Sequence, residues 1–241
     1  MATPDDDPIL TTRDAAQLLG VAVSTVQLWM ESGALPAWKT PGGHRRVRLS
    51  AVLALRQQRG TPEADGQEAS YKQQVAAHYP VPEEESQRLA ALAESRLLDT
   101  PPEEVFDRLA RLAAQITDCP IALVSLVSSQ RQWFKARVGV DISETPREWS
   151  FCSHALAEGK PFVVGDASND PRFAANPLVV GEPHVRFYAG VPLEDGAGRL
   201  LGTLCVLDRE PRRLRERELR ALRELAAIAS DEIKRRRLAR N

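Results

Sequence analysis

The 241-residue sequence predicts two domains: a small, mainly α-helical one and a larger α+β one whose antiparallel sheet is flanked by helices. Three observations support this. Residues 8–60 carry seven basic and two acidic side chains, although the whole chain has a net charge of −1. Residues 61–70 are small, polar and acidic, as is typical of a linker. After residue 82 the segments run helix, helix, two strands, loops, three strands, helix. We therefore expect domains at residues 8–59 and 83–237, joined by a linker at 60–82.

The composition excludes several classes of protein. No apolar run approaches the ~18 residues of a membrane helix, and the acidic N-terminus lacks the features of a secretion signal. The three cysteines, Cys119, Cys152 and Cys205, are odd in number and widely spaced, so we expect reduced thiols rather than a disulfide framework. These observations predict a cytoplasmic protein that has no membrane partner.

Two short helices are expected in the first domain. The first covers about residues 10–20, where a threonine hydroxyl and Asp14 suit the start of a helix. The second covers about residues 23–32, with Val26 and Trp29 on its buried face. Two helices joined by a tight turn form a helix-turn-helix, whose second helix enters the major groove of DNA. The residues expected toward the open side of that helix, or at its margin, are Ser24, Thr25, Gln27 and Leu28.

A basic turn follows these helices. Two β-prone arms flank Pro41-Gly42-Gly43, which is a strong turn signal. The cationic side chains beside its tip would face phosphates. His44 has no His or Cys partner at zinc spacing, so a phosphate contact is favoured over a metal site. A third helix at residues 50–59 completes the domain.

The order of these motifs resembles the winged helix-turn-helix domain of MerR-type and excisionase-like regulators. The matching residues are Ala15-Ala16-x-Leu-Leu-Gly-Val, Thr25-Val26-x-x-Trp29, Gly33-x-Leu-Pro and Thr40-Pro-Gly-Gly-His-Arg-Arg46. In that family the second helix reads the major groove and the wing grips the backbone of double-stranded DNA. The resemblance implies DNA contacts from Ser24, Thr25, Gln27 and Leu28 in the recognition helix, and from Lys39, Thr40, Gly42, Gly43, His44, Arg45 and Arg46 in the wing.

The second domain is predicted from its apolar periodicity. Residues 83–98 have apolar positions at helical spacing, and Pro101-Pro102-Glu103-Glu104 opens a further helix. A long helix follows Pro211. Strands are indicated by β-branched runs or by alternation at residues 120–127, 132–138, 160–165, 185–191 and 200–207.

This second segment resembles a GAF domain. Among the matching motifs are Arg131-Gln-Trp-Phe-Lys-Ala, Ser150-Phe-Cys-x-His-Ala, Asp166-Ala-Ser-Asn-Asp-Pro-Arg-Phe, Arg186-Phe-Tyr-Ala-Gly and Gly202-Thr-Leu-Cys-Val-x-Asp. The resemblance implies a sensor or dimerisation module without catalysis, in which helices cover one face of a sheet and loops wall a cup on the other. The cup could hold a small-molecule effector. The candidate cup residues are Trp149, Phe151, Cys152, His154, Asp166, Arg172, Asn176, Arg186 and Tyr188.

Other roles for these residues remain open. Asp166 could instead pair with Arg172 or Arg186 to anchor loops. Cys152 could be a plain buried thiol, or a redox sensor if it is exposed and its pKa is lowered. A bilin site in related GAF photosensors usually has His directly after Cys, whereas Ser153 intervenes here, and too few further ligands lie near for a metal. We expect no bilin, haem or metal, and the ligand stays unidentified.

The final helix has an apolar seam that can pack on its own sheet or on the helix of a second subunit. The second use would give a homodimer through the GAF helices. The function predicted is a transcriptional regulator in which the GAF domain controls the DNA-binding domain. The alternative is a ligand-independent architectural or recombination accessory protein. No activated nucleophile pair is visible, so an enzyme is not expected. The seam residues are Leu219, Leu222, Ala226, Ala229 and Ile233.

Overall fold

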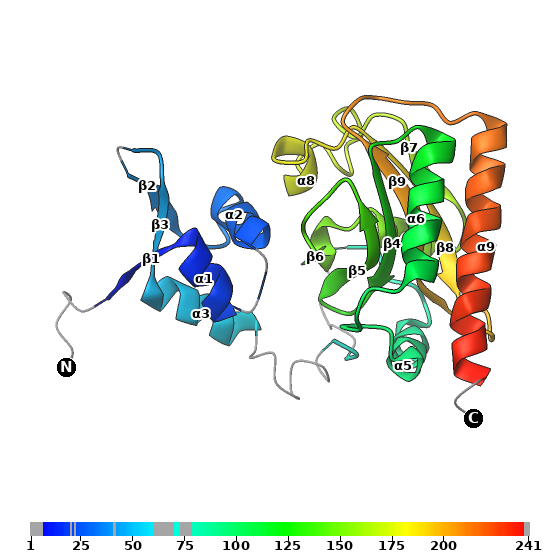
Figure 1. Ribbon diagram of the computed structural model, residues 1–241, viewed down its shortest axis with the longest axis horizontal. Coiled ribbons are helices and arrows are strands. Elements are labelled where there is room, and N and C mark those ends of the chain that lie inside the picture. The colour runs from blue at the N-terminus through cyan, green and yellow to red at the C-terminus, as the bar shows by residue number, and fades with distance from the viewer. Residues whose placement is uncertain are drawn as a thin grey trace. The chain divides into compact units, whose positions relative to one another are not determined.

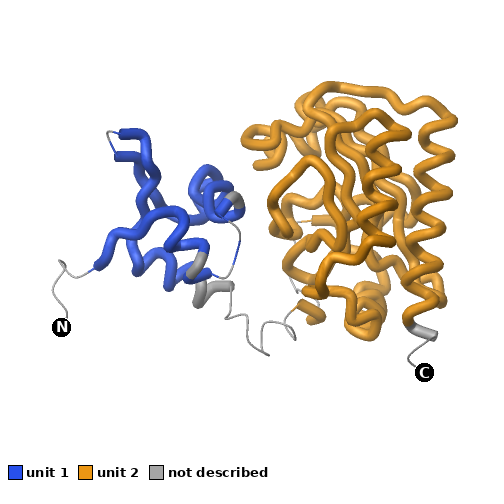
Figure 2. The backbone as a smooth tube through the Cα atoms, in the orientation of Figure 1, with its two compact units in different colours: residues 1–68 blue, residues 69–241 orange. Residues whose placement is uncertain are grey.

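The computed structural model describes residues 7–19, 21, 23–40, 42–59, 70–72 and 79–238. The chain divides into two compact units, residues 1–68 and residues 69–241, shown in different colours in Figure 2. Each unit has its own core. The units correspond in order to the two domains expected from the sequence.

The first unit packs three helices against a small antiparallel sheet (Figure 1). Among its described residues the sheet has the strand order β1-β3-β2. The buried side chains that join helices and sheet include Ala16, Trp29, Leu35 and Val52. The elements are β1 (Ile9–Thr11), α1 (Thr12–Leu19), α2 (Val23–Glu31), β2 (Ala37–Lys39), β3 (Arg45–Arg48) and α3 (Leu49–Arg59).

The start of the first helix differs from the prediction. Residues 9–11 form a strand because they pair with β3, with Ile9 opposite Arg48 and Thr11 opposite Arg46. The predicted cap itself is present. The Asp14 amide donates to Thr11 Oγ1 at 3.2 Å, and the Thr11 amide donates to the Asp14 carboxylate at 3.0 Å. This reciprocal pair satisfies backbone groups at the start of α1.

The second unit contains a larger antiparallel sheet. Its described residues form six strands in the order β6-β5-β4-β9-β8-β7. All five strands predicted for this segment are present, whereas β6, η1, α7 and α8 were not predicted, because only loops were expected between the second and third strands. The elements are α5 (Glu85–Ser95), α6 (Glu104–Thr117), β4 (Ile121–Val127), β5 (Arg131–Val138), β6 (Glu144–Pro146), η1 (Arg147–Trp149), α7 (Cys152–Glu158), β7 (Phe162–Val164), α8 (Pro177–Val180), β8 (Phe187–Glu194), β9 (Leu200–Asp208) and α9 (Glu216–Leu238).

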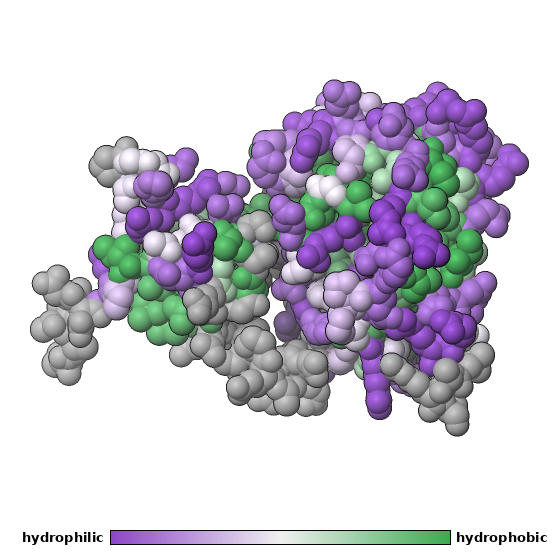
Figure 3. Space-filling model, in the orientation of Figure 1, coloured by the Kyte–Doolittle hydropathy of each residue, from purple (hydrophilic) through white to green (hydrophobic). Residues whose placement is uncertain are grey.

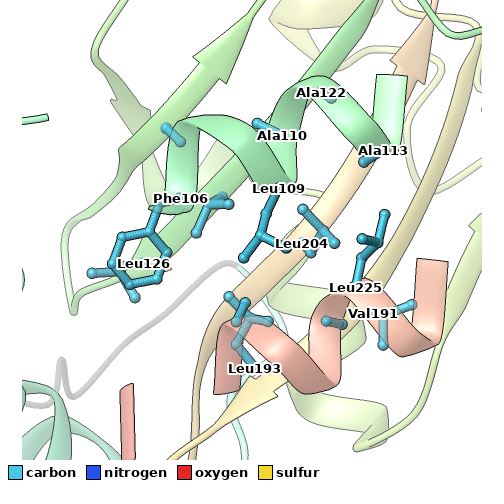
Figure 4. Packing of buried hydrophobic residues seen from close by; sticks show 14 of the residues in the cluster. Phe106, Leu109, Ala110, Ala113, Ala122, Leu126, Val191, Leu193, Leu204 and Leu225 are labelled. Atoms are coloured by element: carbon cyan, nitrogen blue, oxygen red, sulfur yellow. The ribbon is translucent and has the colours of Figure 1, made fainter. Parts of the chain in front are cut away.

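One face of this sheet carries the hydrophobic core. Figure 4 shows Leu109 of α6 pointing toward Leu204 of β9, and the ring of Phe106 lying beside Leu126 of β4; Leu225 of α9 belongs to the same cluster. Because side chains alternate along a strand, the neighbours of Leu204 on β9 point to the other face of the sheet. Thr203 and Cys205 therefore face α7 and the connecting loops.

The apolar seam of the final helix is occupied by its own unit. Leu222, Ala226, Ala229 and Ile233 are buried in the core, and Leu219 is half-buried. Of the two uses predicted for the seam, the structure has the packing on its own sheet. The outer side of α6 and α9 still exposes large apolar residues among charged ones, visible as green patches in Figure 3. These are Leu112, Ile116 and Ile228.

Most of the predicted linker, residues 60–69 and 73–78, lies outside the described residues. The parts that are described pack on the second unit. The Ser129 amide donates to the Ser70 carbonyl at 2.9 Å, and the Tyr79 hydroxyl donates to the Ser129 carbonyl at 2.6 Å. Tyr71 packs against the core. These segments therefore belong to the second unit rather than to a free linker.

None of the helices in the described residues combines the length and the apolar character needed to cross a bilayer.

Candidate functional site

The first unit has a groove between the start of α1, the exposed side of α2 and the turn that joins β2 to β3. Its volume is about 520 Å³. Arginines from two different elements meet there, and none of the described residues that line it is acidic, so the groove suits an anionic partner. The lining residues are Thr11, Thr12, Arg13, Val23, Gln27, Gly43, His44, Arg45 and Arg46.

The turn beside the groove is closed by its own backbone. The Thr40 amide donates to the His44 carbonyl at 2.9 Å, and the Gly43 amide donates to the Thr40 carbonyl at 2.8 Å. Gly43 has a φ of +78°, which favours glycine. A Cβ atom added there would meet nothing within 4 Å. The backbone at this tip is therefore open to close approach by a partner surface.

One arginine of the groove is already paired. Arg45 Nη2 donates to Glu31 Oε1 at the end of α2, and the two side chains are 25% and 34% exposed. The Arg46 guanidinium donates to the Arg45 carbonyl at 2.9 Å. The predicted cluster of wing cations is thus present, but Glu31 neutralises one of its charges.

The groove brings together part of the predicted DNA-binding set. Gln27, Gly43, His44, Arg45 and Arg46 line it. The remaining wing residues, Lys39, Thr40 and Gly42, lie beside the turn but not in the lining.

The prediction of an open position was wrong for two residues of the recognition helix. Thr25 is 1% exposed and Leu28 is 6% exposed. Thr25 lies four residues before the buried Trp29 and three before Leu28, and residues three and four apart share one side of a helix, so Thr25 and Leu28 widen the buried side of α2. The side chain of Ser24 lies outside the described ones, and Gln27 is exposed. The side chains of Thr25 and Leu28 therefore lie on the packed side of α2.

Sequence reasoning missed Arg13 as a groove residue. It was counted in the basic excess of the first domain but was not assigned to the interface. It stands in the first turn of α1, next to the exposed side of α2. The signal that could have found it is its position just after the Thr11 cap, because the first turn of the first helix adjoins the second helix in such a pair.

The second unit has a narrow pocket on the sheet face opposite the core. The volume within it that the centre of a water molecule can occupy is about 30 Å³. This is enough for a few water-sized molecules. Most of its lining is apolar. The residues are Ile121, Leu123, Gln132, Phe134, Val140, Ile142, Thr145, Phe151, Cys152, Leu178, Pro183, Val185, Tyr188, Cys205 and Leu207.

Three of the nine predicted cup residues line this pocket: Phe151, Cys152 and Tyr188. The structure places the other six outside its lining, namely Trp149, His154, Asp166, Arg172, Asn176 and Arg186. Sequence reasoning missed Cys205. The period of two along β9 could have found it, because alternate residues of a strand share one face.

Two of the six residues outside the lining tie α8 and its loop to the unit. Asn176 donates from Nδ2 to the Trp149 carbonyl at 3.0 Å and accepts from the Leu178 amide at 2.9 Å as the N-cap of α8. Arg186 donates to the carbonyls of Val179 and Val185. The contacts of both side chains are therefore those of loop anchors.

The predicted pairs of Asp166 with Arg172 or Arg186 do not form. Asp166 accepts hydrogen bonds from Ser168 and Asn169, and Arg172 pairs with Asp170 at 2.6 Å. Short polar side chains thus bond within their own turn, as is common for Asp.

His154 lies among aromatic rings. Its ring stacks on Phe162, with centroids 5.4 Å apart, and meets the edge of Phe173 at 4.7 Å. Burial, together with the positive charge of Arg172, lowers the pKa of His154. The neutral form is therefore favoured at neutral pH, and it packs as an aromatic residue.

Hydroxyl groups surround the sulfur of Cys152 at the pocket. Thr203 Oγ1 donates to this sulfur at 2.9 Å and the Tyr188 hydroxyl donates at 3.3 Å, while Ser125 Oγ lies 3.4 Å away. The sulfur of Cys205 lies 3.9 Å away. Burial opposes ionisation of Cys152, but the hydrogen bonds from Cys205 and the three hydroxyls outweigh it and lower the pKa of this thiol.

No group of three or more His, Cys, Asp or Glu side chains within the described part of the chain is placed to hold a metal ion.

The first unit has the architecture of a helix-turn-helix domain, and the second is an α+β domain with an antiparallel sheet. The chain belongs to the GAF domain family, since the GAF model matches residues 101–233, more than half of its length. A helix-turn-helix domain model matches residues 9–60. The chain therefore joins a segment that matches a helix-turn-helix model to a GAF domain.

Individual relatives resemble the second unit. A cyclic di-GMP phosphodiesterase of Pseudomonas aeruginosa is 47% identical over 150 residues, which are 62% of this chain and 26% of that protein. The chain thus spans about a quarter of the length of this curated relative. A free methionine-R-sulfoxide reductase from Neisseria meningitidis, solved with its substrate, is 22% identical with a TM-score of 0.47, over 69% of this chain and 99% of that one. The GAF domain of an Acinetobacter phosphoenolpyruvate-protein phosphotransferase is 19% identical with a TM-score of 0.46, over 61% of this chain and 92% of that one.

Proposed function

We propose that this protein is a transcriptional regulator whose first unit binds double-stranded DNA and whose GAF domain controls that binding. The observation that carries the proposal is the groove of the first unit. It places Gln27 of the second helix beside Arg13, Arg46 and the open turn at Gly43. A helix that enters the major groove of DNA beside cations that meet phosphates has this arrangement.

The residues of the groove divide by chemistry. Arg13, Arg45 and Arg46 would contact phosphate oxygens, which fixes the position of the protein without reading sequence. Gln27 is exposed and is the described side chain of α2 that suits a base edge, because an amide can pair with adenine in the major groove. The backbone at Gly43 would approach the sugar-phosphate chain. The sequence preference of the protein would therefore depend mainly on Gln27 among these residues.

Binding to a mixed-sequence DNA duplex tests this proposal. We expect the affinity of the full chain to fall steeply with salt, and Arg13→Ala to reduce both the affinity and the salt slope, the slope by about one. Arg223→Ala is the matched control, because it removes an exposed arginine from α9 in the second unit. Affinity that does not respond to salt, or equal losses in the two variants, would overturn the proposal. Fluorescence anisotropy at several salt concentrations provides the measurement.

Removing Glu31 should strengthen DNA binding. Glu31→Ala frees Arg45 and deletes a negative charge at the edge of the groove, so we expect roughly a 3- to 10-fold higher affinity at low salt. Folding should change little, since a partly exposed ion pair is worth about 0–1 kcal/mol. Glu224→Ala makes the same charge change at an exposed position of α9 and should leave affinity unaltered. Unchanged affinity in Glu31→Ala would show that Arg45 does not reach the DNA.

The GAF domain would act as the control element of this regulator. Its narrow apolar pocket supports a small effector with few polar groups rather than a large or charged one. The dimer predicted from the sequence stays a prediction. It would use the outer side of α6 and α9, at Leu112, Ile116 and Ile228, because the inner seam of α9 is buried. The activity of the phosphodiesterase is not part of the proposal, since the chain spans only about a quarter of that protein.

A further inference from the structure

We propose that Cys152 and Cys205 form a redox site, at which a small hydroperoxide entering the pocket converts the two thiols into an intramolecular disulfide. The inference does not depend on DNA binding. It concerns two buried nucleophilic groups that the proposed regulator leaves unused. It starts from the distance between the two sulfur atoms, 3.9 Å, which is van der Waals contact.

The sheet places the two thiols together. Cys205 lies on β9, two residues after Thr203, so both point to the pocket side. Ser125 of β4 is paired directly opposite Thr203, and Cys152 begins α7 above them. The sulfur of Cys152 therefore lies against the hydroxyl groups of Thr203 and Ser125, and the sulfur of Cys205 lies beside it.

A glycine on β8 makes room for one of these hydroxyls. Gly190 is paired opposite Cys205, and a Cβ atom added to it would lie 2.1 Å from the Tyr188 hydroxyl. The absence of a side chain at Gly190 therefore lets Tyr188 reach back and donate to Cys152. Phe151 stacks on the Tyr188 ring, with centroids 5.2 Å apart, and holds it there.

The hydroxyl donors favour the thiolate of Cys152, which is the form that reacts with peroxides. The neighbouring Cys205 is different: burial raises its pKa well above the ordinary value, so it stays a thiol. The site therefore has one ionisable sulfur and one protonated sulfur in contact. These roles match those of an attacking and a resolving cysteine.

The surface exposure expected of a redox sensor is absent, since Cys152 is 1% exposed, and an oxidant would instead reach both cysteines through the pocket that they line. The volume of the pocket that the centre of a water molecule can occupy is about 30 Å³. A molecule of the size of hydrogen peroxide fits in this volume. Cys119 is also buried, but it does not line the pocket, and burial raises its pKa. Cys119 can therefore serve as an internal control, a thiol of the same chain that is expected not to react.

The chemistry balances with peroxide as the oxidant. The Cys152 thiolate attacks one peroxide oxygen, the O–O bond breaks, and the departing hydroxide takes up the proton that the thiol had released. Cys152 becomes a sulfenic acid, oxidised by two electrons. The Cys205 sulfur then attacks the Cys152 sulfur, the S–O bond breaks, and the hydroxide leaves as water with the Cys205 proton. In total, two thiols and one hydrogen peroxide give one disulfide and two waters.

The test is to treat the reduced full chain with hydrogen peroxide, alkylate the remaining thiols after unfolding, and map the peptides by mass spectrometry. We expect two of the three thiols to be lost and a single linkage, between Cys152 and Cys205, with Cys119 alkylated. A linkage that includes Cys119, oxidation of Cys119 as fast as Cys152, or an unmodified Cys152 in the folded protein would overturn the proposal.

Variants separate the two steps. Cys205→Ser should stop at the sulfenic acid of Cys152, which dimedone traps, and Cys119→Ser should behave like the starting protein. Tyr188→Phe keeps the aromatic ring but removes one donor, so the pH profile of oxidation should move to higher pH. If the pKa of Cys152 rises from about 6 by roughly one unit, the rate should fall roughly tenfold well below pH 6 but only about twofold at pH 7. An unchanged profile in a folded Tyr188→Phe variant would contradict the role of this hydroxyl as a positioning group.

Discussion

Replacing Glu85 by alanine is expected to destabilise the second unit by about 3–5 kcal/mol, because it leaves two arginines buried without their counter-ion. Glu85 is 1% exposed, and it accepts hydrogen bonds from Arg88 at 2.7 and 2.8 Å and from Arg147 at 2.5 Å. Arg147 is itself 1% exposed, and its guanidinium lies 4.6 Å from the centre of the Tyr79 ring. The carboxylate therefore joins α5 to η1, and Arg147 in turn contacts Tyr79 in the segment before α5.

Calorimetry of the full chain can measure this loss. For a unit of this size we expect the transition of the second unit to move down by roughly 6–20 °C. Glu84→Ala is the control, since the neighbouring Glu84 is exposed and should have almost no effect. A shift of the same small size in both variants would mean that Glu85 does not stabilise the arginines.

The same carboxylate predicts a dependence on pH. Burial opposes ionisation of Glu85, but the hydrogen bonds from Arg88 and Arg147 outweigh it, so its pKa lies below the ordinary value of 4.5. A carboxyl group whose pKa is lowered by folding stabilises the fold above the unfolded value, and this contribution is lost as the pH falls through the lowered value. The acid-induced loss of stability below pH 4.5 should therefore be smaller in Glu85→Gln than in the unmodified chain.

Replacing Gly202 by alanine should be the most damaging single change in the sheet. A Cβ atom added there would lie 1.8 Å from the Ser125 carbonyl oxygen and 2.9 Å from the Leu126 Cα, both backbone atoms of β4. Because backbone cannot rotate away, β4 and β9 would have to separate locally. We expect a cost of about 3–5 kcal/mol, at the upper end of the range for point mutations.

Urea unfolding of the full chain, followed by circular dichroism, measures this cost. Gly196→Ala is the matched control, because Gly196 lies in the turn just before β9 and its added Cβ would meet only the Lys234 side chain at 3.7 Å. If both variants unfold at the same urea concentration, the close approach of β4 to β9 at Gly202 is not required.

The long elements of this protein could be predicted because their signals are local. The strand at residues 121–127 is a run of mostly β-branched and apolar residues, and each of its side chains is buried. The cap of α1 depends on Thr11 and Asp14, three residues apart. Neither case needs knowledge of a distant partner.

The short elements could not be predicted, because distant residues create them. Residues 9–11 become a strand only through pairing with residues 46–48 of β3. Likewise, α8 has four residues and depends on Asn176, which also bonds to the Trp149 carbonyl. Propensity over three or four residues is too weak to specify either element.

Site residues were harder to predict than elements. Residue type alone does not distinguish an arginine that binds a ligand from one that holds a loop, as Arg186 does through two backbone carbonyls. The same holds for Thr25, whose hydroxyl suits DNA but whose place on α2 faces the core. Both outcomes depend on the way elements pack, which a single sequence does not show.

The order of strands in the second unit has a consequence for protein synthesis. The central strands β4 and β9 are neighbours in the sheet, but β9 begins only at Leu200. While the ribosome is still translating the residues in between, the backbone amides and carbonyls along one edge of β4 are unpaired. The side chains of β4, which are buried in the folded unit, are then exposed as well. Two unfinished chains could join along that edge. Translation that stalls between β5 and β9 should therefore yield aggregates rather than a stable partial domain.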